Sequence, residues 1–435
     1  MAMFKTGRLY ALLALCCIPF ICSAEDRVVG GDISLIPAYE QAGDQWLDAD
    51  GNVIPDLITF LHDEAGWTAA RVRLMVDPTQ DSDPGTCQDL EYVKQLGRRI
   101  KEAGMLFLLD IFYSDTWTDP AQQWIPQSWN MGKTTATNAL ADKVRAYTTE
   151  SIDALVAAGA TPDYVQIGNE VSYGMLWDNL SAKDKSRHVI YLDPQWFSYE
   201  RQEAQIVRLT SLLGAAAEGV RASDAKEARI ILHIERSGEP EWARNFYEWV
   251  AKAGFTDYDI IGLSYYPFWH GDLNTLSSTV KTLRQALPGK DIHLVETAYN
   301  YQWGPSDAVC KDWEFTKEGQ ATFLHDLVKT LNALDVKALY YWFPEECGNG
   351  KNAVVQNGWL NRGLWTNGNS PHALNSREAL DAFKAFAPTT GVKDITPSGA
   401  CSTDKIYDMG GRRLYAVPEH GAYIRGNEKF LCKEK

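Results

Sequence analysis

Two glutamates in this chain each end a short apolar run, at the point where a buried strand would stop. Glu170 ends Tyr164-Val-Gln-Ile-Gly-Asn-Glu170, and Glu296 ends His293-Leu-Val-Glu296. A buried carboxylate is unfavourable unless it is paired or hydrogen-bonded, and Asn169 and nearby aromatic residues offer partners. Two carboxylates facing each other across a glycosidic bond can act as acid/base and nucleophile, and a separation of about 5 Å gives retention of configuration. The sequence therefore predicts that Glu170 and Glu296 form a catalytic pair.

A salt bridge to an arginine is the competing interpretation for either glutamate alone, although it explains the pair less well. Arg71 and Arg73 alternate with Ala70 and Val72 along another apolar run. An arginine that faces the same interior would hold the nucleophile ionised, because a neighbouring cation lowers the pKa of a carboxylate. We predict Arg73 for this role.

Eight short apolar or β-branched runs alternate with amphipathic helical patterns, which is typical of β/α units around a parallel sheet. The runs are Val28 to Ser34, Ala70 to Val76, Met105 to Phe112, Asp163 to Asn169, Arg229 to Glu235, Tyr258 to Tyr265, Asp291 to Glu296 and Val336 to Phe343. Helical patterns between them include Asp89 to Ala103 and Gly319 to Leu334. Eight strands favour a closed barrel, and no Gly-x-Gly-x-x-Gly follows the first run to indicate dinucleotide binding. The predicted fold class is therefore α/β, a (β/α)8 TIM barrel.

Residues that follow the strands of such a barrel share one face, where its active sites lie. This chain has 15 Trp, and several follow expected strand ends, which favours a cleft for sugars because their apolar faces stack on flat rings. The predicted substrate-binding residues are Asp32, Arg73, Asp115, Trp117, Asn169, His233, Tyr265, Tyr266, Trp269 and Trp342. For any one Trp, packing of a loop explains the residue equally well. Structural roles also stay open for Asp115 and His233.

The charge balance bears on the partner. The chain has 57 Asp and Glu against 42 Lys and Arg, a net charge of −15, whereas phosphate binding requires clustered Lys and Arg. We therefore expect no nucleic-acid partner and a neutral substrate, here a polysaccharide. The protein is also expected to be a monomer.

The two ends of the chain differ from its middle. Residues 1–24 have the pattern of a secretory signal, since Lys5 and Arg8 precede an apolar run from Leu9 to Ile21. Cleavage after Ala24 and lipidation of Cys22 both fit, so the protein is expected to be exported, as a secreted, periplasmic or cell-surface protein, with a membrane tether in the lipidated case. We assign residues 25–388 to the catalytic barrel. Residues 389–435 alternate like short strands and are expected to form a small β appendage.

Cysteine usage is consistent with an oxidising compartment, in which pairing is the default. The cysteines after the signal are Cys87, Cys310, Cys347, Cys401 and Cys432. Cys310 and Cys347 follow consecutive strands, so we predict a bridge between them, a second bridge between Cys401 and Cys432, and Cys87 as the odd residue. The sequence contains no Cys-x-x-Cys motif and no His cluster with zinc-ligand spacing, so no zinc site is expected.

Three strings carry a family resemblance. They are Asp110-Ile-Phe-Tyr-Ser-Asp115-Thr-Trp117-Thr-Asp-Pro120, Val165-Gln-Ile-Gly-Asn-Glu170-Val, and Ile261-Gly-Leu-Ser-Tyr-Tyr-Pro-Phe-Trp-His270-Gly271. Together they resemble arabinogalactan endo-β-1,4-galactanases, glycoside hydrolase family 53, and the resemblance extends from Gly30 to Leu374. It implies that Glu170 is the acid/base, that Glu296 is the nucleophile and that Asn169 orients the sugar hydroxyl beside the reacting carbon.

The resemblance also implies a substrate, β-1,4-galactan, cut internally into short galactooligosaccharides by double displacement without an organic cofactor. Two departures matter. Phe112 stands where family members usually have His, and the loop from Asn300 to Cys310 lacks the calcium-binding run of bacterial relatives. We hypothesise that the Cys310–Cys347 bridge replaces that ion, while structural calcium is not excluded. The alternatives are another β-glycanase, such as a mannanase or xylanase, and a non-catalytic glycan-binding protein.

Overall fold

The structure is a computed structural model, and it divides the chain into two compact units, Met1–Pro388 and Thr389–Lys435. It describes residues 27–83, 85–130, 136–178, 189–190, 198–347 and 361–386, with the backbone of strands at 406–408, 413–414, 421–425 and 428–432. The predicted signal segment lies outside these residues, as does Cys401 of the predicted Cys401–Cys432 bridge. No helix in the described part of the chain is long and apolar enough to cross a membrane.

Eight parallel strands in the first unit close into a barrel in chain order, which confirms the predicted (β/α)8 fold. The strands are β1 (Val28–Asp32), β2 (Ala69–Leu74), β3 (Leu106–Ile111), β4 (Tyr164–Ile167), β5 (Arg229–Ile234), β6 (Ile260–Tyr265), β7 (Asp291–Thr297) and β8 (Ala338–Trp342). The barrel closes where β1 pairs with β8, with Gly30 opposite Tyr340. Each predicted run contains one observed strand or overlaps it.

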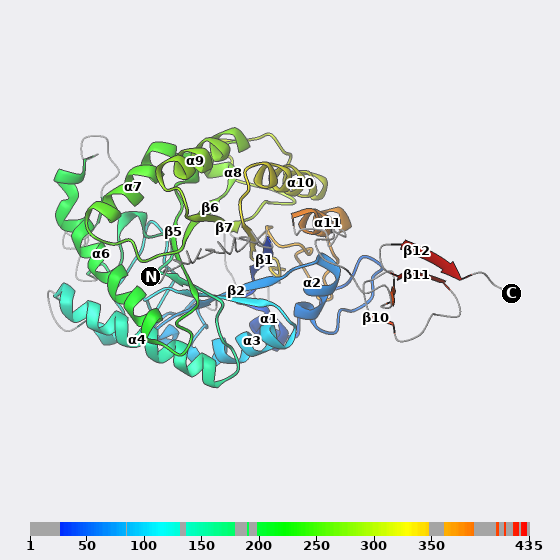
Figure 1. Cartoon of the computed structure of the whole chain (residues 1–435), viewed down its shortest axis with the longest axis horizontal. Coiled ribbons are helices and arrows are strands. Elements are labelled where there is room, and N and C mark those ends of the chain that lie inside the picture. Colours follow the sequence, from blue (N-terminus) through cyan, green and yellow to red (C-terminus); the bar gives the residue numbers. More distant parts are fainter. Residues whose placement is uncertain are drawn as a thin grey trace, which may run out of the picture. The chain divides into compact units, whose positions relative to one another are not determined.

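Helices form an outer ring around the strands (Figure 1). They are α1 (Ile36–Ala42), α2 (Leu57–Ala65), α3 (Leu90–Glu102), α4 (Thr137–Ala157), α6 (Tyr199–Ala222), α7 (Pro240–Lys252), α8 (Pro267–His270), α9 (Leu273–Ala286), α10 (Lys317–Ala333) and α11 (Arg377–Phe386). Helix α3 shows why they form: Asp89 accepts a hydrogen bond from the Tyr92 backbone N–H at its start, and Val93, Leu96 and Ile100 are buried.

The interior of the barrel changes from apolar to charged along its axis. Alternate residues of each strand face inward. A buried apolar cluster forms from Val28, Ala69, Leu108, Ile231, Ile260, Val295, Ala338 and Tyr340. Further towards the carboxyl ends, the same strand faces carry buried polar residues, namely Asp32, Arg71, Asp110 and His233. The fold therefore gathers charged side chains at one end of an otherwise apolar core.

The backbone is irregular at that same end. Tyr113, Glu170 and Phe343, which follow β3, β4 and β8, have φ values of 54°, 49° and 63°, in the left-handed region that non-glycine residues rarely adopt. The pairing of β6 with β7 shifts register between Leu263 and Ser264. Such irregularities re-aim side chains and cluster at functional sites.

The predicted Cys310–Cys347 disulfide is wrong, since both thiols are free, as is that of Cys87. The two side chains have different neighbours. Cys310 lies near Asp312, Tyr265 and Asp272, whereas Cys347 is buried beside residues of the loop after α1. Consecutive strands therefore do not bring these thiols together, and the hypothesis that a bridge replaces calcium loses its basis.

The second unit contains an antiparallel sheet of β9 (Ile406–Asp408), β10 (Arg413–Leu414), β11 (Gly421–Arg425) and β12 (Glu428–Cys432), in the order β10-β9-β11-β12. The four strands of this unit thus form a small β sheet.

Candidate active site

Glu170 and Glu296 line one cleft at the carboxyl ends of β4 and β7. Both residues are almost buried, with exposed fractions of 8% and 6%. The other lining residues are Asp83, Phe112, Trp117, Thr118, Asp119, Gln122, Asn169, Tyr266, Trp269 and Trp342. The cleft therefore combines four carboxyl groups, those of Glu170, Glu296, Asp83 and Asp119, with aromatic walls.

Glu296 is held by a cation and a hydroxyl. Arg71 Nη2 lies 2.8 Å from Glu296 Oε1, and the Tyr266 hydroxyl donates to Glu296 Oε2 at 3.0 Å. Burial raises the pKa of Glu296, while the Arg71 charge and the Tyr266 hydrogen bond oppose that rise. These contacts favour the ionised carboxylate.

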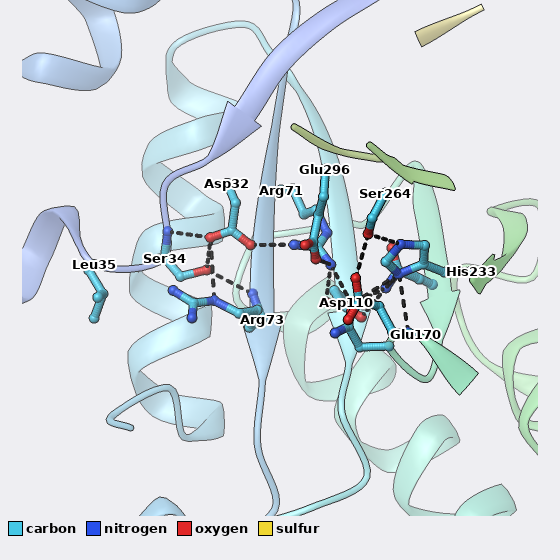
Figure 2. Close-up of polar contacts among 12 residues, drawn as sticks. Asp32, Ser34, Leu35, Arg71, Arg73, Asp110, Glu170, His233, Ser264 and Glu296 are labelled. Atoms are coloured by element: carbon cyan, nitrogen blue, oxygen red, sulfur yellow. Dashed lines mark hydrogen bonds and ion pairs between the residues drawn. The ribbon is translucent and has the colours of Figure 1, made fainter. Parts of the chain in front are cut away.

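Arg71 is the centre of a buried polar network (Figure 2). Its guanidinium also contacts Asp32 Oδ2 at 2.7 Å, Asp110 Oδ2 at 2.6 Å and Asn169 Oδ1 at 2.9 Å. Burial is the largest influence on Asp110 and raises its pKa to about 8, with Arg71 acting in the opposite direction. The arginine is thus fixed in position by three strands before any ligand binds.

The prediction that Arg73 holds the nucleophile was wrong, because Arg71 makes that contact. Both arginines lie on the inward face of β2, but Arg73 is nearer the strand end. Its Nε lies 3.4 Å from Asp32 Oδ1, and its guanidinium stacks over the Trp117 ring at 4.3 Å. Arg73 therefore supports a wall of the cleft from behind.

Glu170 has a different environment. Ser264 Oγ donates to Glu170 Oε1 at 2.6 Å, and Ser264 Oγ also lies 2.8 Å from Nε2 of His233 (Figure 2). Burial raises the pKa of Glu170 well above its ordinary value, and the charges of Glu296 and Glu235 add to the rise. Of the two glutamates, Glu170 therefore has the environment that favours the protonated carboxyl more strongly.

Asn169 lies between the two glutamates in the network. Its side-chain N–H donates to the Thr118 carbonyl at 2.8 Å, and its oxygen accepts from Arg71 and from Gln166. An amide nitrogen carries two hydrogens, so the second one is available to a ligand in the cleft.

Four predicted aromatic residues, Trp117, Tyr266, Trp269 and Trp342, do line the cleft. Trp269 is 47% exposed, whereas Trp342 is buried and has an edge contact with Trp117. Phe112 also lines the cleft, at the position where the family resemblance implies His. Its ring provides an apolar surface with no hydrogen-bonding group.

Four other predicted binding residues do not line this cleft. Asp32 pairs with both arginines, and Asp115 accepts from the backbone N–H groups of Asp77 and Gln127. Tyr265 donates its hydroxyl to the Gly271 carbonyl. His233 is fully buried beneath Glu170, and burial together with the Arg71 charge keeps its pKa well below 6.5. Position after a strand does not show which way a side chain points, so these residues support the site instead.

Ser264 and Glu235 are the polar residues next to Glu170 that sequence reasoning missed. Ser264 lies on the inward face of β6 within the apolar run that ends at Tyr265, so its position in a strand gave a usable signal. Glu235 follows β5, accepts from Ser172 at 2.6 Å and pairs with Arg236 at 2.7 Å.

Comparison with known proteins agrees with this geometry. The family described as glycosyl hydrolase family 53 matches residues 28–386. A probable arabinogalactan endo-β-1,4-galactanase A of Aspergillus terreus is 34% identical over 330 residues, covering 72% of this chain and 84% of that protein. The arabinogalactan endo-β-1,4-galactanase of Cellvibrio japonicus is 30% identical over 371 residues, covering 82% and 90%.

Among solved structures, the family 53 catalytic domain of Ignisphaera aggregans is similar, with a TM-score of 0.67 and 26% identity. The match covers 83% of this chain and 96% of that one. The barrel, its strand-end cleft and the match over nearly the whole first unit agree with one another. The chain belongs to glycosyl hydrolase family 53 and is a glycoside hydrolase.

Proposed function

We propose that this protein is an endo-acting, retaining hydrolase of β-1,4-galactan that releases short galactooligosaccharides. The family supports hydrolysis of a polysaccharide, and the relatives named above are described as endo-β-1,4-galactanases. The observation that carries the mechanism is the unequal environment of two carboxyls in one cleft: Glu296 contacts Arg71, whereas Glu170 contacts the neutral Ser264 hydroxyl.

In the first step, Glu170 donates its proton to the glycosidic oxygen while Glu296 attacks the anomeric carbon. The bond from that carbon to the leaving oxygen breaks, and a covalent glycosyl-enzyme forms. In the second step, the Glu170 carboxylate takes a proton from a water molecule, which attacks the same carbon and releases Glu296. Two inversions give net retention. The raised pKa of Glu170 suits the proton donor, and the Arg71 contact suits the nucleophile.

Other cleft residues would position the sugar. The second N–H of Asn169 is directed to the hydroxyl beside the reacting carbon, where a hydrogen bond strengthens as charge develops on the ring. Trp117, Trp269 and Trp342 offer flat faces for successive sugars. The Tyr266 hydroxyl keeps Glu296 oriented.

The test compares hydrolysis of linear β-1,4-galactan, mannan and xylan by wild type, Glu170→Ala and Glu296→Ala. We expect reducing ends from galactan only, short oligosaccharides as products, and losses on the order of 10³-fold or more in both variants. On an aryl β-galactooligosaccharide whose leaving group needs no protonation, added azide should restore Glu170→Ala with a β-configured glycosyl azide and Glu296→Ala with an α-configured one. Exchange of these two outcomes would reverse the roles, and hydrolysis of mannan or xylan in preference to galactan would overturn the substrate.

We further propose that the protein acts outside the cytoplasm as a monomer, with its first residues processed at Ala24 or lipidated at Cys22. Intact mass of the mature protein distinguishes the two forms by the added lipid. An unprocessed chain beginning at Met1 would contradict export.

A further inference from the structure

We propose that Asp44, Cys347 and His372 form a zinc site that joins the loop after α1 to the loops after β8. A carboxylate oxygen, a thiol sulfur and an imidazole nitrogen from these residues lie within 4.8 Å of one another. All three side chains are buried, with exposed fractions of 5%, 0% and 1%. The trio does not line the catalytic cleft, so this inference is independent of the proposed reaction.

The donor set selects the metal. Thiolate and imidazole ligands suit zinc, whereas calcium and magnesium take oxygen ligands. Zinc bound by one thiolate, one carboxylate and one neutral imidazole leaves no net charge on the group, which favours its burial. Zinc sites are usually four-coordinate, so one further ligand is needed.

Backbone pairing holds the loops in place without a metal. The His372 backbone N–H donates to the Gln45 carbonyl at 2.8 Å, and Leu47 donates to the His372 carbonyl at 2.9 Å. The Asp44 backbone N–H donates to the Tyr39 carbonyl at 3.0 Å. The ligand-bearing positions are therefore brought together by the fold itself, as a binding site requires.

The orientation of His372 is that of a ligand. Its Nδ1 lies 3.0 Å from the Thr366 carbonyl oxygen, which fixes a proton on Nδ1. In the neutral ring, Nε2 then presents a lone pair, and it lies 3.0 Å from Asp44 Oδ1. Two acceptors at this distance repel unless a cation or a proton lies between them. A protonated His372 paired with Asp44 is the competing explanation, but it gives no role to the Cys347 sulfur.

An aromatic residue beside the trio provides independent support. The Tyr39 hydroxyl is fully buried and has no hydrogen-bond partner among the described residues. The Tyr39 ring has an edge contact with Trp46, which follows Asp44 by two residues. A water molecule as fourth zinc ligand would give this hydroxyl a partner.

The experiment measures metal in the full chain, purified without chelator or a metal-affinity column. We expect about one zinc ion per chain in the wild type by elemental analysis. After removal of zinc, cobalt(II) should bind and give the thiolate-to-cobalt charge-transfer band that only a sulfur ligand produces. Zinc should raise the melting temperature of the metal-free protein.

Cys347→Ser and His372→Gln test the ligands, and Cys310→Ser is the matched control because Cys310 is also buried and free. We expect the control to bind zinc like the wild type, Cys347→Ser to lose the charge-transfer band, and both ligand variants to bind zinc at least about 10-fold more weakly. A folded wild type that binds neither zinc nor cobalt would overturn the proposal. Unchanged binding in both ligand variants would do so as well. If a variant fails to fold, the wild-type cobalt spectrum still decides.

Discussion

The surroundings of Glu170 act on its proton affinity in opposite directions. The Ser264 hydrogen bond lowers its pKa, whereas burial and the charges of Glu296 and Glu235 raise it. Because an acid catalyst must be protonated in the free enzyme, the alkaline limb of kcat/KM is expected to follow this pKa. The influences of Ser264 and Glu235 can be removed one at a time by substitution.

Ser264→Ala removes the hydrogen bond that favours the carboxylate. The pKa of Glu170 should then rise further, and the alkaline limb of kcat/KM should move to higher pH. We expect kcat to fall about 10-fold, since a buried hydrogen bond to a charged group is lost. The pH profile on galactan checks this, with Ser277→Ala in α9 as the control. A limb that moves to lower pH would contradict the assignment.

Glu235→Gln should move the alkaline limb of kcat/KM to lower pH. Removing this negative charge lowers the pKa of Glu170, so activity should be lost at a pH lower by about one unit. Glu239→Gln is the matched control, because Glu239 also pairs with Arg236 but is half exposed. An unmoved profile in Glu235→Gln would show that Glu235 carries no charge when the enzyme works.

At this scale the sequence identified some of the residues that line the cleft, whereas five of the ten predicted binding residues do not line it. Glu170 and Glu296 end apolar runs, and that pattern located both. Whether Arg71 or Arg73 meets Glu296 depends on side-chain direction within the barrel, about which strand parity says nothing because both face inward. Asp115 follows a strand like the glutamates, yet its oxygens are used by backbone N–H groups of neighbouring loops.

At the scale of elements, β1 and β2 approach so closely that only glycine fits at position 30. A Cβ at Gly30 would lie 1.9 Å from the Ala69 carbonyl oxygen, which belongs to the adjacent strand and cannot move alone. The strands that carry Asp32 and Arg71 are thereby kept close.

Gly30→Ala should destabilise the protein by about 3 kcal/mol, because the strands must separate to admit the methyl group. Gly214→Ala, in α6 with open space around its Cβ position, should instead stabilise by about 0.5–1 kcal/mol. Urea unfolding monitored by tryptophan fluorescence measures both. Equal effects of the two substitutions would refute the argument from strand contact.

The elements themselves were predictable from hydrophobic periodicity, and the eight strands appear within a few residues of their predicted bounds. What periodicity misses is local irregularity. The register shift beside Ser264 and the left-handed residues after β3, β4 and β8 arise from packing between strands, which no single segment encodes.

At the scale of the whole molecule, the barrel and every residue that lines the cleft belong to the first unit. A chain that ends at Pro388 should therefore fold and keep its kcat/KM on soluble galactan within about twofold. Initial rates and melting temperatures of the two forms check this. A large loss on soluble substrate would show that the second unit contributes to the barrel or the cleft.

The proposed zinc ligands illustrate what sequence reasoning cannot reach at this scale. Asp44 lies far from Cys347 and His372 along the chain, so no short spacing identifies the three residues. The same long-range arrangement explains the failed disulfide: adjacency of strands suggested Cys310 as the partner of Cys347, but loop paths place Asp44 and His372 there instead.

The left-handed backbone at Glu170 bears on what selection preserves. A non-glycine residue there is strained by about 1–2 kcal/mol, and its carboxyl is buried beside a second one. Glu170→Gly should therefore melt at a higher temperature than Glu170→Ala, the reverse of the usual order for these two residues. Selection for folding alone disfavours this glutamate, so selection for its proposed acid/base role is what would maintain it.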